Sequence, residues 1–194
     1  MLKLSKILVN TFLYVFSNKN LNEIDMGNLD MNVLNGGIFE NCTYLQHVKF
    51  PKNLEVIGER CFVNTGLERI KIPNTVVAIL SESFAYNRRI KSSYLSDNLR
   101  HLKMNSFLKC LRLEKIETSD NSLMYESVDG VLYSKDKGIL FLYPEGKIAN
   151  GYTYKIINDS DIIRSLDSNH CTSRRHSAYR CIYQLPLLSV ALPT

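Results

Sequence analysis

The residues best suited to catalysis or metal binding in this chain are its five cysteines and four histidines. One cluster, near the C-terminus, combines imidazole and thiol groups, which are the ligands that zinc prefers. It consists of His170, Cys171, His176 and Cys181. Its spacing fits no compact C-x2-C knuckle, so we expect incidental cysteines and histidines here and no metal or cofactor site.

Nucleophilic catalysis needs a nucleophile beside a base that a third group orients. His47 and His101 stand at different phases of the sequence repeat described below, and no G-x-S-x-G turn lies near either. Paired carboxylates, a P-loop and a dinucleotide-binding fingerprint are also missing. Cys42 and Cys110 each follow a repeated phenylalanine by three residues, a position that favours packing over catalysis. The sequence therefore predicts a protein that is not an enzyme.

The charge distribution gives no support for nucleic-acid binding. The chain has 24 Lys and Arg against 19 Asp and Glu, a net charge of +5, and the two signs are interspersed along the chain. Hydrophobic residues make up 45%, which is enough for a buried core. No apolar stretch reaches the length of about 18 residues that a transmembrane span requires.

Two features bear on the cellular compartment without fixing it. Lys3 and Lys6 precede an apolar run over 7–16 that resembles the start of a signal peptide. Asn10 and Thr11 interrupt this run and no small-residue cleavage site follows, so we interpret it as an incomplete first repeat, with a signal or anchor as the alternative. Asn41 and Asn158 open N-x-S/T sequons, which matter only if the chain is secreted.

The elements that position these residues follow a regular repeat. Phenylalanines recur at steps of 23, 23, 22 and 23 residues, at Phe16, Phe39, Phe62, Phe84 and Phe107. After each comes a short polar link and then a pattern of the form L-x-x-I-x-I, which is broken only by Ser93 and Thr118. Pro51 or Pro73 follows in two copies, and since proline has no N–H to donate we expect it to end the strand.

A second apolar pair precedes the next phenylalanine in each copy. Its members are Met31 and Leu34, Leu54 and Ile57, Val76 and Ile79, and Leu99 and Leu102. One copy alone buries too little to fold, so the copies must stack. The predicted fold is a β-rich repeat solenoid of 22 to 23-residue units with stacked short parallel strands over 1–118, comprising about five repeats of which the first is incomplete.

These residues carry a resemblance to a known family. The segment from Phe39 through Cys42, Leu45, Val48 and Pro51 to Phe62 resembles the BspA-type leucine-rich repeat, and the likeness extends over about 12–118. The resemblance implies a leucine-rich repeat fold and, as for many members, a place at the cell surface or in the secreted fraction, in adhesion or host contact.

The pattern changes beyond residue 118. Strand-like segments at 125–128, 131–134 and 139–143 surround an Asp129-Gly130 pair, which favours a type I′ turn, so 119–147 should form a small β-hairpin or meander insert. Such inserts also occur between repeats of the family that the chain resembles. We interpret 148–166 as a degraded repeat and 167–194 as an irregular or disordered tail.

Outward-facing strand positions are the candidate binding surface. Stacked strands align one residue per turn, so two columns read Asp25, Lys49, Lys71, Tyr94 and Glu117, and Glu23, His47, Arg69, Ser92 and Lys115. The central repeats thus combine His47, Lys49, Arg69, Lys71 and Tyr94. Such a patch could bind an acidic protein or a sulfated glycan through charge complementarity, although a solvated sheet face is the simpler alternative.

The functional hypothesis is a binding or adhesion module that uses this strand face. An intracellular structural scaffold, located in the cytoplasm, and a non-functional gene remnant are the alternatives. The ligand and the oligomeric state do not follow from the sequence.

Overall fold

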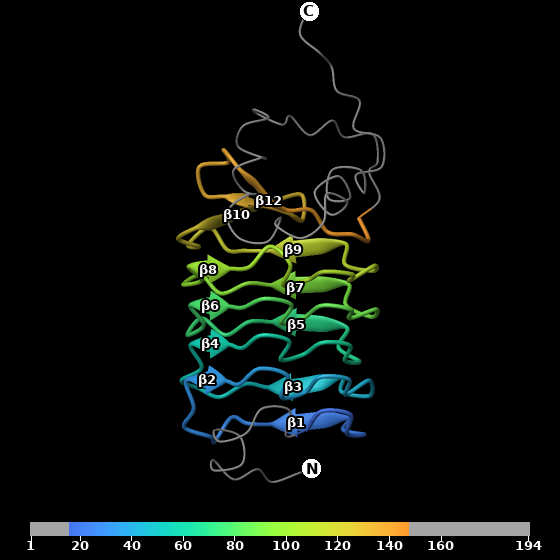
Figure 1. Cartoon of the computed structure of the whole chain (residues 1–194). Coiled ribbons are helices and arrows are strands. Elements are labelled where there is room, and N and C mark those ends of the chain that lie inside the picture. The colour runs from blue at the N-terminus through green and yellow to red at the C-terminus, as the bar shows by residue number, and fades with distance from the viewer. Residues whose placement is uncertain (1–15, 148–194) are drawn as a thin grey trace, which may run out of the picture.

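The chain folds into a solenoid of stacked turns, which confirms the expected fold class. The computed structural model describes residues 16–147. One three-residue strand per turn builds the strand face: β1 (Glu23–Asp25), β3 (His47–Lys49), β5 (Arg69–Lys71), β7 (Ser92–Tyr94) and β9 (Lys115–Glu117). These strands run parallel, as Figure 1 shows. Strands followed by Gly27 or Ser96 are as short as those followed by proline, so the corner of each turn ends the strand and the expected role of Pro51 and Pro73 was wrong.

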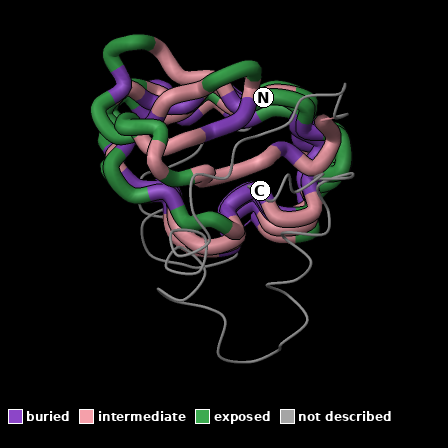
Figure 2. Tube along the Cα trace, turned by 90° about the horizontal axis from the view of Figure 1, so that it is seen from above, coloured by how far each residue is buried: buried purple, intermediate pink, exposed green. Residues whose placement is uncertain are grey.

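A second parallel sheet lies beside the first, and the sequence analysis did not anticipate it. Its two-residue strands are β2 (Val33–Leu34), β4 (Val56–Ile57), β6 (Ala78–Ile79) and β8 (His101–Leu102), paired in that order. The last residue of each belongs to the predicted apolar pair and is buried. Each turn therefore closes around a core between two short strands, and buried chain alternates with exposed corners when the stack is seen along its axis (Figure 2).

The repeated phenylalanines form one continuous stack inside the solenoid. Successive ring centroids lie 5.7, 5.1, 5.3 and 5.3 Å apart, with interplanar angles of 18° or less. This is the offset parallel geometry that aromatic rings favour. Each of Phe16, Phe39, Phe62 and Phe84 also donates its N–H to the carbonyl of the residue before the next phenylalanine. The phenylalanine thus sets both the core contact and the backbone spacing of every turn.

The link after each phenylalanine contains a left-handed residue. Two positions beyond the ring, Asn18, Asn41, Asn64, Tyr86 and Lys109 all have φ between 52° and 61°. Asparagine tolerates this region better than most residues because its short polar side chain can hydrogen-bond locally. Three of the five copies accordingly carry asparagine, and Asn64 Nδ2 donates to Asn41 Oδ1 at 2.9 Å.

The first sheet is interrupted at one level of the stack. β1 pairs with β3, and β5 pairs with β7 and β9, but β3 and β5 are not paired. Met26 and Ile72 each donate an N–H to the strand above, at 2.9 and 2.8 Å, whereas the equivalent N–H of Phe50 donates to no backbone carbonyl within residues 16–147. Phe50 is partly exposed and packs edge-on against Phe62 with centroids 5.9 Å apart. The second sheet continues without a break past the same level.

A three-stranded antiparallel meander covers the end of the stack, as expected for this segment (Figure 1). Its strands are β10 (Tyr125–Val128), β11 (Val131–Ser134) and β12 (Leu140–Leu142). Asp129 and Gly130 have φ of 50° and 76°, the positive values that a type I′ turn requires. The degraded repeat expected over 148–166 and the tail expected over 167–194 lie outside the described residues.

The meander satisfies backbone groups that the last turns leave open. Gly130 O accepts the Ile116 N–H at 2.8 Å, and Tyr125 Oη accepts the Leu102 N–H at 3.2 Å. Glu145 accepts the Lys109 N–H at 2.8 Å through its carboxylate. Because unpaired backbone groups at the end of a repeat array are costly and invite association, the meander acts as a cap for this end of the stack.

Candidate functional site

The strand registers place the candidate binding residues as the sequence columns predicted within each sheet. Asp25 lies opposite Lys49 and Glu23 opposite His47 in the β1–β3 pair. In the β5–β7 pair, Arg69 lies opposite Ser92 and Lys71 opposite Tyr94. His47, Lys49, Arg69 and Lys71 are exposed and Tyr94 is half-buried. The structure therefore gathers these five residues, here called the strand-face patch, on adjacent turns of one side of the solenoid.

Two of the patch cations have partners on a neighbouring turn. Lys49 Nζ lies 3.0 Å from Asp25 Oδ2. The pKa of the Asp25 carboxyl lies below its ordinary value because it accepts hydrogen bonds from the Gly27 N–H and from the Lys49 ammonium. Lys71 Nζ lies 5.7 Å from the centroid of the Tyr94 ring, within the range of a cation–π contact.

His47 and Arg69 form no ion pair among residues 16–147 and remain open to solvent. They stand on either side of the interrupted level between β3 and β5. The patch is therefore not one continuous sheet face, as the sequence columns implied, because its two halves belong to separate sheets. Val48 and Phe50, which point inward at this level, are partly exposed.

The described cysteines are buried and chemically silent. Cys42 and Cys110 have no exposed surface, and their thiols donate to Phe16 O at 2.9 Å and Phe84 O at 3.1 Å. Burial raises the pKa of all three described thiols, that of Cys61 well above its ordinary value and that of Cys110 to about 12. Since the thiolate is the nucleophile, these groups are unsuited to covalent catalysis at neutral pH.

The described histidines do not form a site. His47 lies on β3 of the first sheet and His101 on β8 of the second. Within residues 16–147, no group of three or more His, Cys, Asp or Glu side chains is placed to hold a metal ion. The cluster of His170, Cys171, His176 and Cys181 and the Asn158 sequon lie outside the described residues. Asn41, in the other sequon, is half-buried and accepts the hydrogen bond from Asn64.

A sequence model described as the BspA type leucine rich repeat region matches residues 12–127 in six copies. The chain belongs to the BspA-type leucine-rich repeat family. The match extends past residue 118, where the sequence analysis ended the solenoid, and finds one copy more than the five that were expected. A search of curated proteins found no significant match.

Solved leucine-rich repeat structures share the fold of this BspA-type chain. A leucine-rich repeat protein from Eubacterium ventriosum matches with a TM-score of 0.57 and 22% identity, over 75% of this chain and 44% of that protein. The pneumococcal vaccine antigen PcpA matches with a TM-score of 0.50 and 23% identity, over 63% of this chain and 36% of the antigen. This chain therefore spans less than half the length of either structure.

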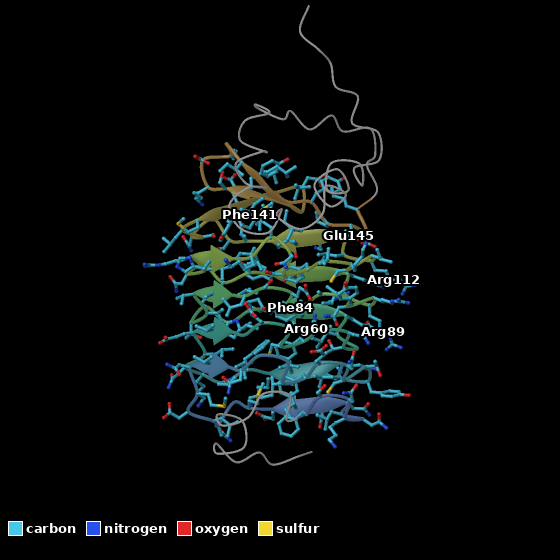
Figure 3. The ribbon with its side chains drawn as sticks, in the orientation of Figure 1. Arg60, Phe84, Arg89, Arg112, Phe141 and Glu145 are labelled. Atoms are coloured by element: carbon cyan, nitrogen blue, oxygen red, sulfur yellow. The ribbon has the colours of Figure 1, made fainter. Side chains whose placement is uncertain are left out.

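The sequence analysis of this BspA-type repeat missed a second basic surface. Arg89 and Arg112 each stand five residues after a phenylalanine, at the corner where the link enters β7 or β9. Both project from the same edge of the solenoid, one above the other (Figure 3). The equal spacing from Phe84 and Phe107 could have revealed them, but attention to strand positions alone left the link out. No helix among the described residues could cross a membrane.

Proposed function

We propose that this chain is a non-enzymatic protein-binding module whose strand-face patch docks an acidic protein partner. The observation that carries the proposal is the exposed His47 and Arg69 beside Lys71 on a rigid face, with no carboxylate among the described residues paired to them. Aligned charges of one sign on a fixed scaffold favour a complementary partner and speed its association. A solenoid supplies such a surface without a catalytic pocket.

The patch is tested by removing its cations in pairs. The double variant Arg69→Ala/Lys71→Ala should bind immobilised poly-L-glutamate about tenfold less tightly at low salt than the unchanged chain, because two ionic contacts are lost. The matched control is Arg100→Ala/Lys103→Ala, which removes the same charge from exposed positions on and beside β8. Equal weakening in both variants would mean that net charge alone drives binding, and the patch would not be the site.

The proposal extends to location, at the cell surface or in the secreted fraction. It rests on membership of the BspA-type family and on the description of one similar structure as a vaccine antigen. Surface biotinylation of intact source cells, followed by detection in the labelled and cytosolic fractions, tests it. Label on the protein supports an adhesive role, whereas confinement to the unlabelled cytosol contradicts the location and leaves an intracellular scaffold.

A further inference from the structure

A second group of cations lines the edge where the polypeptide enters strands β7 and β9. It consists of Arg88, Arg89, Lys91 and Arg112, here called the basic edge, and all four are exposed. Arg89 and Arg112 occupy the same position in successive repeats, and Figure 3 shows them stacked along the solenoid axis. Successive turns are fixed by the Phe84 and Phe107 rings, whose centroids lie 5.3 Å apart.

The backbone beneath this edge is held by buried polar side chains. Asn87, directly before Arg88, has no exposed surface and donates through Nδ2 to Phe62 O at 2.6 Å and Phe84 O at 2.7 Å. Its Oδ1 accepts from both the N–H and the hydroxyl of Thr65. Cys110, before Leu111 and Arg112, donates to Phe84 O at 3.1 Å. The cations thus project from a preorganised corner, which lowers the entropic cost of binding.

The basic edge is not neutralised by the protein itself. Each ion pair among residues 16–147 uses other cations, namely Lys49, Arg60, Lys115, Lys137 and Lys147. Arg60 shows the contrast, since it bridges Glu40 and Glu82 on neighbouring turns. The acids closest in the backbone ladder are Glu68 and Glu114, which are bonded through their backbones to Lys91 and lie on either side of it. Four cations crowded without internal partners favour an external anion.

We infer that the basic edge binds a sulfated glycan. Guanidinium groups present a planar fork of donors that matches the oxygens of sulfate and carboxylate groups. Apolar groups lie among the cations, because Tyr86 is 42% and Leu111 is 55% exposed, and these can pack against the C–H faces of sugar rings. Glu68 and Glu114 interrupt the positive surface, which disfavours the evenly charged phosphate backbone of a nucleic acid. This inference is independent of the strand-face patch.

The test uses the full chain and heparin as the probe. Affinity for heparin at 0.15 M salt and its salt dependence are measured for the unchanged chain and for Arg89→Ala/Arg112→Ala, on protein shown to be folded by circular dichroism. The edge variant should bind roughly tenfold more weakly, and its log-log salt slope should fall by about two contacts at roughly 0.7 to 0.9 each, as for polyanions of high charge density. The control Arg100→Ala/Lys103→Ala should retain its affinity.

Three comparisons decide the assignment. Desulfated heparin should bind at least tenfold more weakly than heparin, and Arg69→Ala/Lys71→Ala should keep most of the heparin affinity while losing poly-L-glutamate. Single-stranded DNA or poly-L-glutamate bound through the edge as tightly as heparin would overturn the glycan assignment. Equal losses in the edge and control variants would overturn the site, whatever the fate of the strand-face patch.

Discussion

Buried thiols tie individual residues to the backbone of the neighbouring turn. The position three residues after each phenylalanine holds Cys42, Thr65, Asn87 and Cys110 in successive turns, and the two cysteines and Asn87 donate to phenylalanine carbonyls of the turn before. A weak S–H donor suffices here because the alternative is an unsatisfied buried carbonyl. Packing of Cys42 and Cys110 was expected from the sequence, and their full burial confirms it.

The raised pKa of Cys110 leads to a pH-dependent prediction. Burial keeps this thiol protonated up to about pH 12, whereas in the unfolded chain it ionises near its ordinary pKa of 9.0. Above pH 9 the folded state therefore binds more protons than the unfolded state, and the free energy of unfolding falls as pH rises. Between pH 8 and 9.5 Cys110 should contribute a loss of about 1 kcal/mol.

Urea unfolding at the two pH values, for the unchanged chain and for Cys110→Ala, measures this contribution. The variant should lose less stability between pH 8 and 9.5 than the unchanged chain does, because one titrating thiol has been removed. Identical losses in the two proteins would show that Cys110 ionises equally easily in both states, and hence that it is not buried in solution.

At the scale of elements, the meander depends on a glycine at its first turn. A Cβ on Gly130 would lie 2.6 Å from Lys115 Cβ, and its φ of 76° disfavours any side chain. Gly130→Ala should therefore reduce the free energy of unfolding by about 2 to 4 kcal/mol through strain and the weakened Ile116 hydrogen bond. Thermal or urea unfolding measures the change.

Gly138 in the second turn of the meander is the matched control. Its φ is not in the left-handed region, and an added Cβ would approach only the flexible Asp136 carboxylate, at 3.4 Å. Gly138→Ala should change the free energy of unfolding by less than about 0.5 kcal/mol. A similar cost at both glycines would contradict the capping contact between Gly130 and the last turn.

The elements show how far sequence reasoning reaches. The phenylalanine spacing and the alternating apolar residues predicted the strands of the first sheet and the meander, because each pattern repeats with a clear period. The second sheet was missed since its strands hold only two residues, too few for alternation to appear. The basic edge was missed because Arg89 and Arg112 lie in links, where no strand periodicity marks a direction.

The broken pairing between β3 and β5 is a property of the whole stack that no single repeat reveals. It coincides with Phe50, the largest side chain at its repeat position, and with a link after Phe62 that is one residue shorter than the link after Phe39. Both features were visible in the sequence. Their effect depends on how two turns meet in space, which repeat spacing alone does not describe.

The interruption predicts a local difference in hydrogen exchange. The Phe50 N–H, with no backbone acceptor in the described part of the chain, should exchange much faster than the equivalent amides of Met26 and Ile72. Native-state amide exchange followed by NMR measures the three rates in one sample, and the flanking amides serve as internal controls. Equal protection of all three amides would mean that β3 and β5 pair in solution.

In mechanical terms the solenoid is a short beam reinforced along two sides, with one side unstitched at a single level. Bending stiffness is lowest there, and the intact second sheet acts as the hinge line. A load that bends the beam away from the strand face would open the joint between His47 and Arg69. A ligand that holds cations above and below that joint would splint it, so occupancy of the patch and rigidity of the molecule are coupled.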